Sequence, residues 1–158
     1  MKFDVNAFEI YDKDWALLTA GSAEKFNTMT ISWGGLGTLW NKPVVTVYVK
    51  PIRYTHEFME ESDYFTVSFY KEECRQALML LGSRSGRDGD KVSAAGLTAL
   101  PVGESVTFKE ARVTLLCKKI YRQDMDTSAM PQDVIADYYE EEAAHTMYIG
   151  EVVKIIKM

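Results

Sequence analysis

The chain contains little cysteine and little histidine, and the few that it has stand far apart. Its 158 residues include two cysteines, Cys74 and Cys117, and two histidines, with no C-x-x-C pair. A disulfide framework or a structural zinc site requires several such ligands at close spacing. We therefore expect no metal site, and the free thiols favour a reducing compartment, the cytoplasm.

Long hydrophobic runs and an excess of positive charge are also lacking. The longest apolar run, residues 44–49, is interrupted by Thr46 and is far too short to span a bilayer. Residues 1–4 do not begin a signal peptide, because Asp4 and Asn6 stand where an apolar core should be. The net charge of −5 argues against general nucleic-acid binding, which requires a basic surface. We thus expect neither a membrane nor a nucleic acid as a partner.

The remaining composition is that of a globular domain. Hydrophobic residues make up 47% of the chain, and no segment is repeated or of low complexity. A chain of this length can bury a substantial core, and neither a linker nor a change in composition divides it. We expect a single domain over residues 1–158.

Alternating and β-branched segments predict six or seven strands. The expected strands cover residues 15–20, 25–33, 44–49, 64–70, 106–108, 112–121 and 146–158. Capping signals and helical periodicity predict short helices at 55–62, 71–81, 92–95 and 134–139, the second of them stopped by Gly82. A strand-rich chain with few βαβ alternations favours a mainly β fold, namely a closed or nearly closed antiparallel barrel with short inserted helices.

One expected strand carries hydroxyl groups in strict alternation. Thr28, Thr30 and Ser32 share one of its faces. They could hydrogen-bond a polar ligand, or they could form the solvated face of an ordinary strand. Trp33 follows, beside glycines 34, 35 and 37, which we expect to break the strand. This tryptophan could be the wall of a site for a flat aromatic ligand, or a core or interface residue. The glycines match neither a dinucleotide-binding fingerprint nor a P-loop.

The segment KPIRYT, residues 50–55, opens a predicted helix. Thr55 is its expected N-cap, and Tyr54 and Met59 are placed for a hydrophobic staple. The Arg53 guanidinium, a hydroxyl and free helical N–H groups would together form an anion site. The alternative is a capped helix with a surface arginine. The absence of acidic residues between positions 24 and 57 supports the anion site, because the chain has 23 acidic residues in all.

Residues 83–91 form a polar loop that contains Arg84, Arg87 and Lys91. The loop is either mobile and solvated, or it folds over Arg53 and closes a phosphate pocket.

The segment 124–144 is mostly acidic, and we expect a loop with one helical piece. Three consecutive carboxylates at 140–142 cannot all face one ion, so this segment favours a solvated surface over a metal site. His145 follows it and could contact a substrate or shuttle a proton, or be structural.

Taken in order, several segments resemble the flavin reductase-like, flavoredoxin-type FMN-binding proteins. The matching segments are NTMTISW at 27–33, KPVV at 42–45, VKPIRYT at 49–55, FTVSF at 65–69, SGRDGDK at 85–91 and HTMYIGEV at 145–152. Together they extend over most of the chain. The resemblance implies an antiparallel Greek-key split β-barrel that binds FMN, usually as a homodimer with the flavin near the subunit interface.

The resemblance also implies a set of site residues. Residues 29–33 would line the ribityl chain and the flavin ring, Arg53 and Thr55 with Lys50 would hold the phosphate, and residues 85–91 would close over it. The expected cofactor-binding residues are Asn27, Met29, Thr30, Ile31, Ser32, Trp33, Lys50, Arg53, Tyr54, Thr55, Ser85, Arg87 and Lys91, with His145 as a donor or substrate contact.

The resemblance thus implies an FMN-dependent reductase that moves electrons between NAD(P)H, or a small redox partner, and bound FMN. Because a flavin carries the redox chemistry itself, the protein need not supply a general base. Two alternatives remain. One is a flavin-binding electron carrier or sensor without turnover, and the other is a barrel that binds another phosphorylated ligand.

Overall fold

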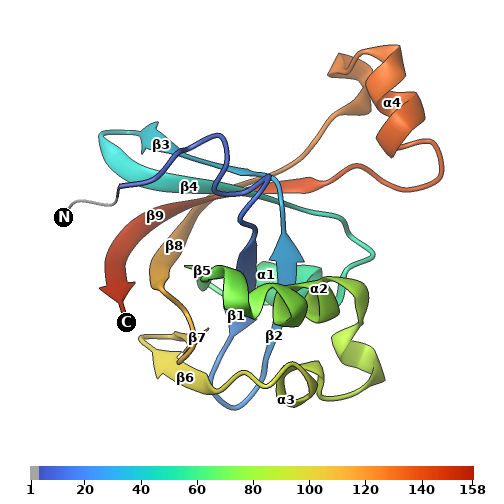
Figure 1. Ribbon diagram of the computed structural model, residues 1–158. Coiled ribbons are helices and arrows are strands. Elements are labelled where there is room, and N and C mark those ends of the chain that lie inside the picture. The colour runs from blue at the N-terminus through green and yellow to red at the C-terminus, as the bar shows by residue number, and fades with distance from the viewer. Residues whose placement is uncertain (1–3) are drawn as a thin grey trace.

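The computed structural model describes residues 4–158. The expectation that residues 1–4 begin no signal peptide concerns a segment that lies mostly outside the described residues. Seven antiparallel strands form one sheet in the order β2–β1–β5–β8–β9–β4–β3 (Figure 1). They are β1 Ala16–Gly21, β2 Phe26–Ile31, β3 Gly34–Leu39, β4 Lys42–Val49, β5 Tyr64–Phe69, β8 Val113–Asp124 and β9 Thr146–Lys157. A second, two-stranded sheet consists of β6 Ala99–Val102 and β7 Ser105–Phe108.

The large sheet curls into a barrel because its two edge strands are joined directly. β2 ends at Ile31 and β3 begins at Gly34, yet these strands lie at opposite ends of the sheet order. A link of this length spans at most about 11 Å, so the two edges meet there without pairing. The pairs β1–β5, β5–β8 and β4–β9 connect strands that are distant in sequence. The chain therefore folds as an antiparallel split β-barrel, which confirms the predicted fold class.

Both faces of the central strands are buried. The barrel interior is filled by a cluster that includes Leu18, Val47, Phe65, Phe69 and Tyr148. A second cluster includes Leu17 and Phe108, together with Leu78 and Leu81 of helix α2 (Arg75–Ser83). Leu17 and Leu18 belong to different clusters because successive side chains of a strand point to opposite sides. The barrel therefore has an inner core, which also contains Phe58 and Met59 of helix α1 (Tyr54–Glu61), and an outer core, which helix α2 covers.

Short helices are inserted between the strands. They are α1 Tyr54–Glu61, α2 Arg75–Ser83, α3 Lys91–Ala94 and α4 Gln132–Tyr138, with 3-10 turns η1 Glu72–Cys74, η2 Gly86–Asp88 and η3 Thr127–Ala129. Helices α1 and α2 pack on the β1–β2 side of the barrel (Figure 1). Among residues 4–158, no helix combines the length and the apolar character that crossing a bilayer requires.

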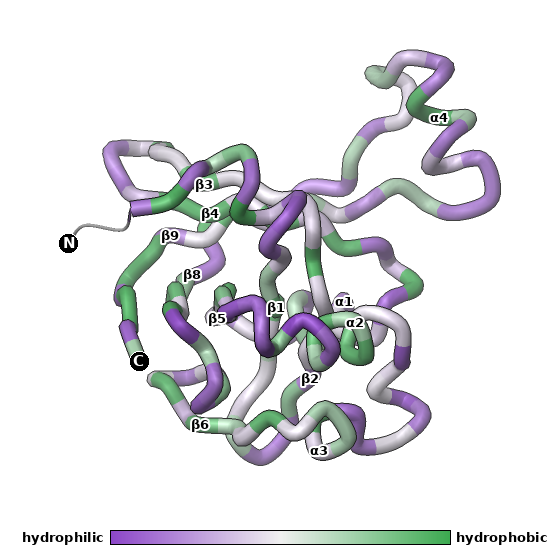
Figure 2. The backbone as a smooth tube through the Cα atoms, viewed as in Figure 1, coloured by the Kyte–Doolittle hydropathy of each residue, from purple (hydrophilic) through white to green (hydrophobic). Residues whose placement is uncertain are grey.

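Residues 125–144, between β8 and β9, form an excursion that we name the arm. It projects from the barrel and carries α4, orange at the upper right of Figure 1. No residue of α4 is buried. Figure 2 shows hydrophilic stretches on both sides of the few hydrophobic residues of α4. The arm thus lacks a hydrophobic core of its own.

The expectation that glycines 34, 35 and 37 break the preceding strand is wrong, because that strand ends before them. These glycines belong to β3, which pairs with β4 along its whole length. An ideal Cβ on Gly34 would lie 2.7 Å from the Tyr11 ring, so this glycine is required for close packing rather than for a turn. The interruption lies earlier, at Ser32 and Trp33. Strand β6 was also not expected from the sequence. The prediction of six or seven strands was therefore too low, since residues 4–158 contain nine.

Two predictions about helix ends are wrong as well. Arg53, not Thr55, is the N-cap of α1, and Thr55 accepts a hydrogen bond from Asn27 instead (2.9 Å). Tyr54 is the first residue of α1 and packs on the Phe58 ring rather than forming a staple from outside the helix. Gly82 does not stop α2 but lies within it. A Cβ there would come within 3.1 Å of Thr30, so the glycine lets α2 approach β2.

Candidate functional site

A cavity of about 690 Å³ opens beside β2, between α1, the loop 83–91 and the base of the arm. Its volume is ordinary for a small-molecule site. Every site residue that the resemblance implies lines it, namely Asn27, Met29, Thr30, Ile31, Ser32, Trp33, Lys50, Arg53, Tyr54, Thr55, Ser85, Arg87, Lys91 and His145. The structure therefore brings the whole predicted set together around one space.

The sequence did not predict all of the lining. The additional residues are Tyr48, Ile52, Ser83, Gly86, Asp88, Tyr138 and Glu142, while Arg84 belonged to the loop cluster noted above. Gly86 and Asp88 stand inside the segment 85–91 that was expected to close over the phosphate, although neither was named as a contact residue. Tyr138 and Glu142 come from the arm, where an acidic and irregular sequence carries no signal that it returns to the barrel.

The three alternating hydroxyls of β2 do not share one role. Thr28 is fully buried, 2.8 Å from the Thr19 hydroxyl, and it donates to the carbonyl of Leu18. It neither lines the cavity nor meets solvent, so both interpretations of its hydroxyl are wrong. The alternation failed there because β2 is covered on both sides. Thr30 lines the cavity but donates to a carbonyl of α2, whereas Ser32 lies at the open end of the strand.

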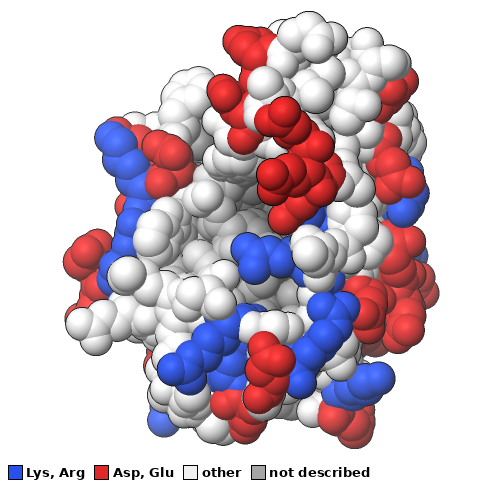
Figure 3. Space-filling model, turned by 90° about the vertical axis from the view of Figure 1, so that its right-hand side faces the viewer, with Lys and Arg blue, Asp and Glu red and all other residues white. Residues whose placement is uncertain are grey.

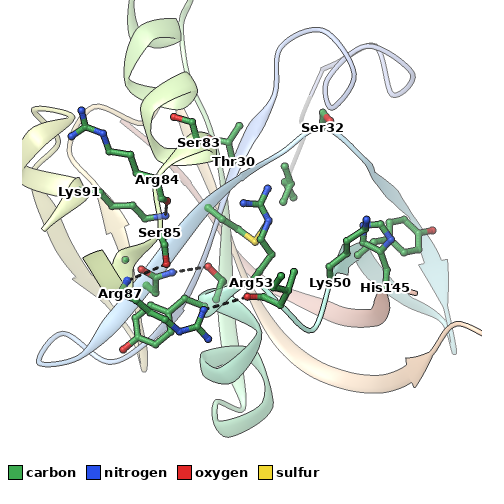
Figure 4. Close-up of a pocket in the computed structure, with 18 of the residues that line it drawn as sticks. Thr30, Ser32, Lys50, Arg53, Ser83, Arg84, Ser85, Arg87, Lys91 and His145 are labelled. Carbon is green, nitrogen blue, oxygen red and sulfur yellow. Dashed lines mark hydrogen bonds between the residues drawn. The ribbon is translucent and has the colours of Figure 1, made fainter. Parts of the chain in front are cut away.

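One end of the cavity, which we call the basic end, is built from β2, the start of α1 and the loop 83–91. The loop packs closely, since an ideal Cβ on Gly86 would lie 2.1 Å from the Asn27 amide oxygen. Ser85 caps the turn η2 by accepting a hydrogen bond from the backbone N–H of Arg87. Asn27 in turn donates to Thr55 of α1. These contacts hold the loop beside Arg53 (Figure 4). This placement agrees with a loop that folds over Arg53 and not with a solvated loop.

The cations of the basic end differ in how much of their hydrogen-bonding capacity is in use. Arg87 pairs with Glu57, donates to the carbonyl of Ile52 and lies over the Tyr54 ring at 4.7 Å. Arg53 donates only to the carbonyl of Gly82, at 3.3 Å, and forms no ion pair within residues 4–158. A guanidinium has five N–H donors, so Arg53 retains most of its capacity.

Lys91 is buried at the same end. Its ammonium donates to the carbonyls of Leu81 and Arg84, each at 3.0 Å, and it has no carboxylate partner among the described residues. Burial, followed by the positive charge of Arg53, lowers the pKa of Lys91 to about 8. No carboxylate of the described residues pairs with Lys91 to offset these two effects. A bound anion would raise the pKa of Lys91 and would itself be attracted by the positive charge of the ammonium.

The other end, which we call the aromatic end, is formed where β2 passes into β3. Trp33 is 45% exposed, with the Tyr138 ring 5.3 Å away and the His145 ring 5.5 Å away, measured between centroids. Lys50 lies beside His145, away from Ser85 and Arg87 (Figure 4). Its ammonium is 2.6 Å from the Glu142 carboxylate and also donates to the carbonyl of Tyr138.

His145 is almost fully buried at this end. Its Nδ1 lies 2.7 Å from the Tyr139 hydroxyl. Burial, followed by the charges of Lys50 and Arg53, lowers the pKa of His145 to about 4. The imidazole is therefore neutral at pH 7. Burial likewise raises the pKa of Tyr139, so this phenol keeps its proton.

The charges around the cavity are segregated. Figure 3 shows a hollow with Lys and Arg side chains in and below it, and acidic side chains above it, on the side of the arm. The arm contains six acidic residues and no basic residue. One mouth therefore combines a basic end that suits an anion with an aromatic end that suits a flat ring.

Comparison with known proteins gives a family and a fold. The model of the flavin reductase-like domain matches residues 11–157. A flavoredoxin from Methanosarcina acetivorans is similar in structure, with a TM-score of 0.74 and 21% identity, covering 100% of this chain and 75% of that one. An FMN-binding protein from Thermus thermophilus with bound p-hydroxybenzaldehyde gives 0.74 and 18%, covering 100% and 82%. The flavoredoxin of Desulfovibrio vulgaris (Miyazaki F) gives 0.72 and 20%, covering 100% and 77%. No curated protein matches the chain.

Proposed function

The chain belongs to the flavin reductase-like family, and we propose that it binds FMN in this cavity and acts as a flavin-dependent oxidoreductase. The observation that carries the proposal is Arg53, a cavity cation with most of its donors unused and no ion pair among the described residues. A phosphate monoester is dianionic at neutral pH and matches the guanidinium fork. The names of the similar solved structures, which include FMN-binding proteins, support the same ligand.

The basic end fits the phosphate. Arg53 would contribute charge-assisted hydrogen bonds, and the ammonium of Lys91 has one donor beyond the two that its carbonyl contacts use. The glycine at position 86 lets the loop backbone approach Asn27 closely, where any Cβ would fill the space. Thr55 stands at the first turn of α1, where unpaired N–H groups favour an anion. These residues would hold the phosphate without a metal ion.

The aromatic end fits the flavin ring. Trp33 offers an apolar wall, and the Ser32 hydroxyl has no hydrogen-bond partner among the described residues, so it is available to a polar ring edge. Lys50 stands at this end, paired with Glu142, and we assign it to the attachment of the arm rather than to the phosphate. His145 would face the reaction partner of the ring.

FMN supplies the electron chemistry when bound, and the residues of the chain bind, orient and shield it. As the electron source we propose NAD(P)H or a small redox protein. Trp33 and Tyr138 would limit how a donor approaches, and the neutral His145 would offer a hydrogen bond without adding charge. The apolar walls would exclude water from the reacting atoms.

We also propose that the chain forms a homodimer. An apolar hollow of about 470 Å³ on the β3–β4–β9 side is lined by residues such as Leu36, Val44, Leu115, Val152 and Ile155. Val153 at its rim is 46% exposed. A second copy would cover this surface and bury its apolar area. Light scattering of the wild type should give a molar mass twice that of one chain. The variant Val153→Glu should give a molar mass closer to that of one chain. A monomeric wild type would refute the dimer.

The visible absorption spectrum of purified protein tests the main proposal. Added FMN should show shifted, resolved bands, and anaerobic NADH or NADPH should then bleach them. Bound FMN that no pyridine nucleotide bleaches would instead support a carrier or a protein donor. A protein that leaves the FMN spectrum unchanged would refute the assignment and leave a different phosphorylated ligand as the alternative.

A further inference from the structure

The arm contributes more than a wall to the aromatic end. Tyr139 is the residue that follows α4, and its hydroxyl is the one hydrogen-bond partner of the His145 side chain within residues 4–158. Their rings meet edge to face, with centroids 5.6 Å apart. The ammonium of Lys50 lies 5.7 Å from the centre of the Tyr139 ring. Tyr139 thus contacts the imidazole directly, and Lys50, from a distant segment, contacts the Tyr139 ring.

The hydrogen bond between Tyr139 and His145 can be formed in two ways. Either the phenol donates to an unprotonated Nδ1, which leaves the proton of the imidazole on Nε2, or Nδ1–H donates to the phenol oxygen. The second arrangement leaves the phenol proton without an acceptor among the described residues, so that only solvent could accept it. The first arrangement uses that proton within the fold and leaves an N–H donor at Nε2 of a ring that lines the cavity.

We propose that Tyr139 is a positioning residue that holds His145 as the Nε2–H tautomer, so that the site presents an uncharged hydrogen-bond donor to a carbonyl oxygen of the second substrate. This inference rests on the proposed function for the identity of that substrate as a reaction partner of FMN. Trp33 and Tyr138 flank the donor with aromatic surface. The chemical class that fits is a flat ring compound with a carbonyl group, and the carboxamide of a nicotinamide belongs to it.

The charges around the imidazole agree with a neutral donor. Lys50 and Arg53 oppose its protonation, and Glu142 favours it. Glu142 is itself held by Lys50 at 2.6 Å, which neutralises much of its influence. Removing the Tyr139 hydroxyl would change none of these charges, so its effect on His145 can be measured separately.

Imidazole NMR on the full chain tests the tautomer directly. The chain has only two histidines, and His56, whose Nε2 lies 2.9 Å from the Thr146 hydroxyl, serves as the internal reference. Wild-type His145 should show a protonated Nε2 and an unprotonated Nδ1 at pH 7. Tyr139→Phe keeps the ring and should give a mixture of tautomers, whereas Tyr138→Phe should leave the tautomer of His145 unchanged. A protonated Nδ1 in the wild type would overturn the proposal.

The sign of the pKa change in Tyr139→Phe provides a second, independent readout. A phenol that donates to Nδ1 stabilises the neutral imidazole, so its loss should raise the pKa of His145 toward the ordinary value of about 6.5. A phenol that accepts from Nδ1–H would stabilise the imidazolium, and its loss would lower the pKa. An unchanged or lowered pKa would therefore contradict the proposal.

The substrate class is tested with a matched pair of ring compounds. Benzaldehyde should shift the His145 Nε2–H signal of the wild type, whereas toluene, which lacks the carbonyl, should not; equal shifts would refute a carbonyl contact. In the FMN-loaded protein, Tyr139→Phe should slow bleaching by NADH roughly tenfold while FMN affinity stays unchanged. A loss confined to FMN affinity would contradict a positioning role. Because the NMR measurements need no flavin, they test the tautomer even if FMN does not bind.

Discussion

The two ends of the cavity are built in different ways. At the basic end, strand β2, helix α1 and the loop 83–91 hold one another through close contacts, such as Gly86 against Asn27. At the aromatic end, Trp33 and His145 meet side chains of an arm in which no residue of α4 is buried. The difference indicates that the barrel would anchor the proposed ligand, whereas the approach of its reaction partner would be shaped by a segment with few packing constraints.

The largest effect is expected at the basic end. Arg53→Ala removes the cavity cation that forms no ion pair with a described residue and should weaken FMN binding by roughly 10- to 150-fold, the cost of a charge-assisted hydrogen bond. Arg112→Ala removes the same charge from an exposed position outside the cavity and should change FMN affinity by less than about twofold. Fluorescence titration measures both. Equal affinities of the two variants for FMN would show that Arg53 does not bind the phosphate.

The close packing of the loop gives the next prediction. Gly86→Ala places a methyl group against Asn27 and should lower the free energy of unfolding by about 1–3 kcal/mol. It should also weaken FMN binding severalfold, because the loop must move outward. Gly37→Ala meets no atom within 4 Å and should stay within about 0.5 kcal/mol of the wild type. Urea unfolding distinguishes the two, and a wild-type stability for Gly86→Ala would mean that the loop is not packed as described.

At the aromatic end, substitutions should alter the spectrum more than the affinity. Trp33→Ala should shift the visible bands or change the fluorescence of bound FMN, with a loss of affinity of only about 2- to 10-fold. Trp40→Ala is the matched control, because Trp40 is 60% exposed and lies outside the cavity. An unaltered spectrum in Trp33→Ala would place the ring elsewhere.

The pKa of Lys91 predicts how FMN binding depends on pH. In the free protein this pKa is about 8, and a bound phosphate should raise it, so the complex holds more protons than the free protein above pH 8. FMN affinity should therefore fall severalfold between pH 7 and 9. The phosphate itself, with a second pKa of about 6, does not titrate in this range. Lys91→Gln should flatten the profile, and a flat profile in the wild type would exclude Lys91 from the phosphate site.

The smallest effect is expected for the attachment of the arm. The Lys50 and Glu142 side chains are 23% and 45% exposed, and solvent screens most of the attraction in such a pair. Lys50→Met should therefore change FMN affinity by less than about threefold, while cleavage within residues 125–144 by a protease should become faster. If Lys50→Met weakened FMN binding as much as Arg53→Ala does, Lys50 would be assigned to the phosphate site instead.

The basic end was predictable because its signals are local in sequence. An arginine before a helix, a run without acidic residues and a Ser/Gly loop with cations can each be seen within a few positions. What the local signals missed is which contacts each residue makes. Thr28 and Thr55 were assigned ligand or cap roles, yet both satisfy buried partners across the fold.

The contribution of the arm could not be predicted for a physical reason. Its acidic composition is equally suited to a solvated loop, and the contacts of Tyr138, Tyr139 and Glu142 depend on where the chain returns after α4. Strand β3 was missed for a related reason, because glycines at an edge pair through their backbone and leave no pattern of side chains. Long-range packing decides both cases.

The central claim, that the basic end recognises a phosphate, is tested most directly by comparing FMN with riboflavin, which lacks the phosphate, on the wild type and on Arg53→Ala. We predict that the wild type binds FMN roughly 10- to 150-fold more tightly than riboflavin, and that this preference largely disappears in the variant. Equal affinity of the wild type for both flavins, or a preference that survives the loss of Arg53, would contradict the account.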